Sequence, residues 1–270
     1  MPASDDGRPA KARSSVWSQR ASGLARLATL SIVCMAAAWL YVVAPKAGDS
    51  DVEILSYVGQ ELMEGGGYSA DTLRQVNEET AGVLHSGWCA ARAIEDLTIV
   101  RTALVEAAFV ENDADAAEKF LVQADEAAHM GLTCNPNSSA LWAVLAWNEF
   151  IKNDDTPRLH ALLDMSYRTG PYDGWALIRR VDMQLRFLPN ISDVERARLV
   201  DQIDWLILSD LLPLVAARFV EGGEPQKALI KEILSRTDEQ DQKKAATMIR
   251  QQGGDIELPF VEPLGARPWR

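Results

Sequence analysis

Apolar residues recur at intervals of three and four along most of the chain after residue 69, which is the spacing of one face of an α-helix. In the stretch 90–110 this stripe consists of Ile94, Leu97, Val100, Leu104 and Ala108. Residues 139–147 are apolar on all sides, which is typical of a central, buried helix. No stretch shows the sustained alternation of a half-buried strand. The pattern therefore predicts an all-α fold.

Residues with known capping preferences mark several helix starts. Ser69 precedes one apolar stripe, and Ser192 and Glu195 have the spacing of a capping box, in which each side chain binds the other's backbone N–H. Asp173 follows a Gly-Pro pair and is expected to cap the next helix with its carboxylate. Residues 253–270 show no clear periodicity and are predicted to form an extended C-terminal tail.

The predicted breaks between helices are regularly spaced. Helix pairs turn at Asn112, Asn153, Pro189 and Gly222, and the joints between pairs carry Asn-Pro at 135–136 and Gly-Pro at 170–171, with the prolines 35 positions apart. Trp142 and Trp175 lie 33 positions apart. A two-helix unit with a period near 34 residues resembles the tetratricopeptide repeat over about residues 90–251.

The motif content of this resemblance is thin. Trp142, Leu145 and Ala146 occupy the family's Trp, Leu and small-residue positions, whereas Arg179 and Glu149 stand where the family has a small residue and a Tyr. The resemblance implies antiparallel helix pairs stacked as a short, degenerate tetratricopeptide-like solenoid. We expect this helical-repeat domain at 89–252, with a linker and accessory helices at 46–88.

The stretch 27–45 carries no charge and, as a helix, would span about 28 Å, close to the thickness of a bilayer core. Basic residues precede it and acidic residues follow. We therefore predict a transmembrane helix at 22–45, a disordered cytoplasmic tail at 1–21 and, in a single-pass protein, a C-terminal domain outside the cytoplasm. A cleaved signal peptide is the alternative, but its apolar core would usually be shorter.

Charge is unevenly distributed. The whole chain has a net charge of −12. Residues 1–45 contribute +3, so residues 46–270 contribute −15. An acidic domain argues against nucleic acid as a partner, because phosphate binding requires clusters of basic residues.

Two cysteines lie beyond the predicted membrane segment. If that region is outside the cytoplasm, Cys89 and Cys134 are expected to oxidise to a disulfide. Two unrelated buried thiols are the alternative. A metal site is not predicted, because neither cysteine has a second ligand at short spacing.

No catalytic motif stands out. The three histidines, His85, His129 and His160, have no second histidine or cysteine within a helical turn, and the chain lacks a nucleophile elbow and a phosphate-binding glycine loop. The chemistry of the sequence therefore predicts no catalytic residue, no metal and no cofactor.

The stretch 166–180 concentrates a Gly-Pro pair, aromatic residues and two arginines. Gly170 is expected to end a helix in the left-handed conformation, and Arg179 and Arg186 flank Asp182 at spacings that allow ion pairs within one helix. These structural roles leave Tyr172 and Arg180, which we identify as candidate residues for binding an anionic partner in a groove.

Three stretches resemble uncharacterised, membrane-anchored bacterial proteins associated with surface polysaccharide export: CNPNSSALW, LLDMSYRTGP and GWALIRR. The resemblance implies a non-catalytic periplasmic scaffold or adaptor with protein partners in the inner membrane or periplasm. An enzyme that uses a carboxylate pair on an envelope glycan, and a polysaccharide-binding module without catalysis, are the alternatives. An enzyme would require two acids facing one cleft.

Overall fold

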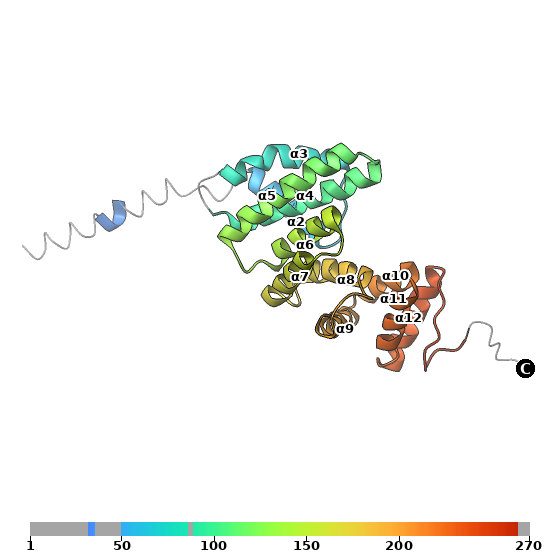
Figure 1. Cartoon of the computed structure of the whole chain (residues 1–270). Helices are drawn as coiled ribbons and strands as arrows, with labels where there is room; N and C mark the ends of the chain where they lie inside the picture. Colours follow the sequence, from blue (N-terminus) through green and yellow to red (C-terminus); the bar gives the residue numbers. More distant parts are fainter. Residues whose placement is uncertain (1–31, 36–49, 86–88, 264–270) are drawn as a thin grey trace, which may run out of the picture. The chain divides into compact units, whose positions relative to one another are not determined.

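The computed structural model describes residues 32–35, 50–85 and 89–263 of the chain. The regular elements in these ranges are all helical, and no strand occurs among them (Figure 1). After a helical segment at 32–35, they are α2 (Ser50–Met63), α3 (Ala70–Thr80), the 3-10 helix η1 (Ala81–His85), α4 (Ala91–Glu111), α5 (Ala114–Cys134), α6 (Ser139–Asn153), α7 (Pro157–Thr169), α8 (Gly174–Arg186), α9 (Asp193–Leu208), α10 (Leu212–Glu221), α11 (Glu224–Leu234) and α12 (Glu239–Gln251).

The predicted fold class needs one correction. Among the described residues, none of the helices has both the length and the apolar character needed to cross a membrane. The predicted transmembrane helix at 22–45 is therefore not found, and apart from 32–35 that segment lies outside the described residues. The predicted tail at 1–21 also lies outside them. The helical character of the second part of the chain agrees with the sequence pattern.

The chain divides into two compact units, residues 1–50 and 51–270. In the second unit, α4 packs against α5 and α6 packs against α7, each pair being joined by a short turn (Figure 1). The turn between α4 and α5 depends on Asn112, which adopts a left-handed conformation with φ of 56° at the end of α4. Asparagine tolerates this conformation better than other residues with a side chain.

Three apolar clusters form the core of this unit. The first cluster contains residues of the successive helices α2 to α5 and includes Leu97 and Val100. The second contains residues of α5, α6, α7 and α8 and includes Leu141. The third contains residues of α8 to α12 and also Ile256 and Leu258, which follow the last helix. Residues 252–263, which are not helical, are thus anchored by these two buried apolar side chains.

The predicted helix starts are confirmed. The side chains of Ser69 and Asp173 accept hydrogen bonds from the backbone N–H groups of their helices, and Ser192 and Glu195 form the reciprocal capping box. These caps satisfy N–H groups that have no partner inside the helix.

The predicted disulfide is also confirmed. Cys89 lies just before α4 and Cys134 is the last residue of α5, so their bond closes the open end of the α4–α5 hairpin. The link spans 45 positions of sequence, and the two Cα atoms lie 5.4 Å apart. It therefore adds a covalent link between α4 and α5 at the end opposite the turn that connects them.

Candidate functional site

Arg180 lies in the interior of the joint between α7, α8 and α9. Its side chain is 1% exposed, and its five N–H donors have five oxygen acceptors. Nε donates to Gln202 Oε1 at 2.7 Å, Nη1 donates to Ser166, and Nη2 donates to the carbonyls of Gly170 and Pro171. Burial lowers the pKa of Arg180 to about 10, against the opposing effect of the Asp173 carboxylate.

This arrangement corrects the expectation that Arg180 faces a groove. Its guanidinium binds the backbone carbonyls of Gly170 and Pro171 in the turn that follows α7. No donor of the guanidinium remains for a ligand.

Tyr172 occupies a different environment. Its side chain is 47% exposed, its ring stacks on Trp205 with centroids 5.8 Å apart, and its hydroxyl donates to Asp201 at 3.1 Å. The hydrogen bond to the Asp201 carboxylate raises the pKa of Tyr172. The structure therefore places Tyr172 on the surface between α8 and α9, apart from the buried side chain of Arg180.

Gly170 also differs from its prediction. Its φ of −166° is extended backbone rather than the left-handed region, so the conformation alone does not require glycine. The lack of space requires glycine, because a Cβ at position 170 would lie 2.7 Å from Ser139 Oγ of α6. The glycine allows the α7–α8 turn to approach the start of α6 closely.

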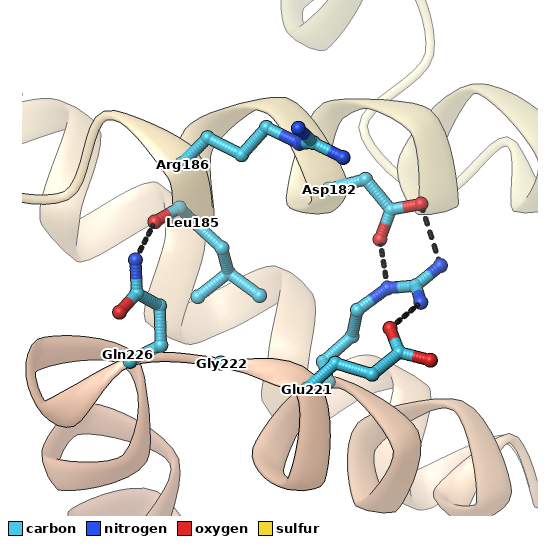
Figure 2. A pocket seen from close by; sticks show the side chains of 8 residues that line it. Asp182, Leu185, Arg186, Glu221, Gly222 and Gln226 are labelled. Atoms are coloured by element: carbon cyan, nitrogen blue, oxygen red, sulfur yellow. Dashed lines mark hydrogen bonds and ion pairs between the residues drawn. The ribbon is translucent and has the colours of Figure 1, made fainter.

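A polar cleft of about 360 Å³ lies between α8 and the α10–α11 turn (Figure 2). Its lining consists of Asp182, Leu185, Arg186, Arg218, Glu221, Gly222, Gly223 and Gln226. Arg218 of α10 donates to both oxygens of Asp182, at 2.5 and 2.8 Å, and to Glu221 at 2.9 Å. Asp182 therefore forms a bidentate ion pair between α8 and α10 instead of the predicted ion pairs within α8.

The pairing of Asp182 with Arg218 leaves Arg186 without a carboxylate among the described residues. Arg186 is exposed at the edge of the cleft, and its guanidinium lies over the Phe150 ring with 5.7 Å to the centroid. Arg179, the other arginine expected to bind Asp182, pairs with Glu106 of α4 and stacks on Trp175. Only Arg186 of the two presents an unpaired cation to solvent.

Gln226 crosses the opposite wall of the cleft. Its Nε2 donates to the Leu185 carbonyl at 2.8 Å, while its Oε1 is buried and has no hydrogen-bond partner in the described part of the protein. Gly222 allows this side chain to lie against the backbone, since a Cβ there would be 2.8 Å from Gln226 Cβ. Within the described ranges, the cleft thus combines an arginine that has no ion pair with an amide oxygen that has no donor (Figure 2).

His160 makes contacts that sequence spacing did not reveal. Its Nδ1 lies 2.6 Å from Glu195 of α9, and its Nε2 lies 2.6 Å from Asp155. Burial lowers the pKa of His160, but the hydrogen bonds to Asp155 and Glu195 outweigh burial and raise it above its ordinary value. The cluster joins α7 to the capped start of α9 and is best described as a structural ionic link.

Among the described residues, no group of three or more histidine, cysteine or acidic side chains is arranged to hold a metal ion. Comparison of the chain with protein-family models, with curated proteins and with solved structures finds no match in any of the three. The resemblances to tetratricopeptide repeats and to polysaccharide-export proteins therefore remain predictions.

Proposed function

We propose that this protein is a non-catalytic adaptor of an oxidising, extracytoplasmic compartment, and that the cleft between α8 and the α10–α11 turn binds an extended segment of a partner protein. The compartment is supported by the Cys89–Cys134 disulfide, because such bonds persist mainly outside the reducing cytoplasm. We further propose that the process served is assembly or export of a cell-surface polysaccharide, on the basis of the sequence resemblance alone.

The adaptor proposal rests on one observation: the cleft contains two polar groups that lack partners within the described residues. Among the residues that the structure describes, Arg186 has no ion pair and the buried Gln226 Oε1 has no donor. An acidic peptide segment supplies both partners, since its carboxylate fits an arginine fork and its backbone N–H fits the amide oxygen. The expected partner segment therefore carries an Asp or Glu.

The enzymatic alternative would use Asp182 and Glu221, the two acids that line this cleft. Arg218 donates to both carboxylate oxygens of Asp182 and to one oxygen of Glu221. Asp182 would therefore have to break its contacts with Arg218 before it could reach a glycosidic oxygen. This geometry favours binding over glycan cleavage.

The test compares two charge reversals in the full chain, Arg186→Glu in the cleft and Arg196→Glu on the exposed surface of α9. Cells that carry each variant are cross-linked, and the amount of co-purified polysaccharide-export protein and of surface polysaccharide is measured. Arg186→Glu is expected to reduce partner recovery about tenfold or more. It places a carboxylate against the carboxylate of the partner, and this repulsion costs at least about 1.4 kcal/mol of binding free energy. Arg196→Glu is expected to leave recovery unchanged.

Equal losses for both variants would show that the cleft has no special role. A wild-type chain that recovers no such partner, or whose deletion leaves surface polysaccharide unchanged, would contradict the proposed process. Release of new sugar ends from envelope glycan by the purified chain would instead support the enzymatic alternative.

A further inference from the structure

A second pocket, of about 480 Å³, lies between α3, α4 and α5. Its lining consists of Arg74, Asn77, Glu78, Ala81, Arg101, Asp113, Ala116, Lys119, Phe120 and Gln123. Three of these residues are basic and two are acidic. A net positive lining is unusual in a domain with so strong an excess of acidic residues.

Arg101 of α4 contributes a buried cation to this pocket. Its side chain is only 5% exposed, yet no carboxylate of the described residues lies in ion-pair contact with it. Nε donates to Asn77 Oδ1 at 2.9 Å and Nη1 donates to the Gln123 carbonyl at 2.8 Å. These bonds occupy two of the five N–H donors of the guanidinium.

The charge of Arg101 is thus poorly compensated. Burial lowers the pKa of Arg101, and the more distant Glu126 opposes that effect only in part. A buried arginine normally has a carboxylate partner, because an unpaired charge away from water is costly. The described residues thus leave the Arg101 guanidinium without a carboxylate in contact.

The other basic residues of the pocket differ in their availability. Arg74 already pairs with Asp71 and Glu111, whereas the Lys119 ammonium lies over the Phe120 ring at 5.5 Å and forms no ion pair within the described ranges. Lys119 is exposed at the pocket edge. It can provide a second contact for an anion bound to Arg101.

Gln123 contributes a hydrogen-bond acceptor to the pocket, whereas Arg101 and Lys119 contribute donors. Its Oε1 is buried and has no hydrogen-bond partner in the part of the chain that is described. A buried acceptor without a donor costs about 1–3 kcal/mol, so a ligand that brings a hydroxyl to this atom gains affinity. The bound molecule should therefore carry a hydrogen-bond donor beside its anionic group.

We propose that this pocket binds a small hydroxylated carboxylate of the uronic acid class. The carboxylate pairs with the unused donors of Arg101, and a ring hydroxyl donates to Gln123 Oε1. Lys119 closes the site over the bound acid. The inference is independent of the proposed adaptor function, because the pocket is built from α3, α4 and α5 and the adaptor cleft from α8, α10 and α11.

The experiment is a calorimetric titration of the full chain at constant ionic strength with galacturonate, galactose, acetate and inorganic phosphate. Galacturonate is expected to bind about tenfold or more tightly than galactose, which lacks the carboxylate, and than acetate, which lacks the hydroxyls. Trigalacturonate separates a free acid from a chain-borne residue, and binding of either one supports the proposal.

Two variants tie the binding to the pocket. Gln123→Glu is nearly isosteric and supplies an internal carboxylate near Arg101, so it is expected to weaken galacturonate binding about tenfold or more. Gln240→Glu makes the same change of charge on the exposed surface of α12 and is expected to leave the affinity unchanged. Thermal unfolding checks that both variants are folded.

The proposal is overturned if wild type binds neither galacturonate nor trigalacturonate, or if acetate or phosphate binds as tightly as galacturonate. Undiminished galacturonate binding by a folded Gln123→Glu variant would place the site elsewhere and would also overturn it.

Discussion

Asp96 gives the protein a pH-dependent stability that can be estimated from the structure. It lies on α4 with 0% of its side chain exposed, and Gly59 of α2 packs directly against it. Arg92 Nε lies 3.2 Å from Oδ1, but neither carboxylate oxygen has a partner with good hydrogen-bond geometry. Burial raises the pKa of Asp96 to about 6, an effect that Arg92 and Ser56 oppose and that Glu95 reinforces.

The size and sign of the effect follow from this pKa. The ordinary pKa is 3.8, and a rise to about 6 corresponds to about 3 kcal/mol between protonated and ionised forms. Because the folded state binds the proton more tightly than the unfolded state, the stabilisation is fully present below pH 3.8. It is lost progressively as the pH rises through about 6 and is absent at pH 8.

Asp96→Asn removes the charge with almost no change of shape. At pH 8 it is expected to raise the free energy of unfolding by about 1–3 kcal/mol, because the folded state no longer holds an ionised carboxylate away from water. At pH 4.5 the advantage should be much smaller. Urea unfolding of wild type and variant at both pH values measures the difference, and Asp115→Asn on the exposed surface of α5 is the control.

A difference between wild type and Asp96→Asn that does not grow with pH would refute this reasoning. A variant less stable than wild type at pH 8 would show that the contact with Arg92 outweighs the cost of burying the charge.

Two further predictions concern the disulfide and the buried arginine. Replacing Cys89 and Cys134 by serine is expected to lower the free energy of unfolding by about 4 kcal/mol in the chain-entropy model for a 45-residue loop, as measured by urea unfolding; a reductant should destabilise wild type but not the double variant. Arg180→Met should cost about 3 kcal/mol in the same assay, because the Pro171 carbonyl and Gln202 Oε1 lose the donor that Arg180 supplies. Arg196→Met is its control, and equal stability of the two variants would contradict the role of Arg180.

Local features of the chain were predictable from the sequence because neighbouring residues determine them. Apolar spacing indicated the helices, and the caps at Ser69, Asp173 and Ser192 required only residues three positions away. The Cys89–Cys134 bond was predictable for a different reason, since only two cysteines remained once the predicted membrane segment was set aside. That success depended on counting, not on knowledge of the fold.

Contacts between distant helices were not predictable in this way. Asp182 was expected to bind an arginine of its own helix, but its partner Arg218 lies 36 positions further along. His160 likewise binds Glu195, 35 positions away. Both contacts join residues of different helices at nearly the same separation in sequence. A search for opposite charges at that separation would have identified both contacts.

Arg180 and Arg101 show why burial alone does not identify a binding residue. Both are arginines with almost no exposed surface, and neither has a carboxylate in ion-pair contact among the described residues. Arg180 satisfies every donor with oxygens of its own chain, so adding a ligand would require breaking existing bonds. Arg101 satisfies two of five and lines a pocket, so a ligand can supply what the chain does not. The number of unmatched donors, which only the folded structure determines, therefore separates an arginine that holds the fold from one that can hold a ligand.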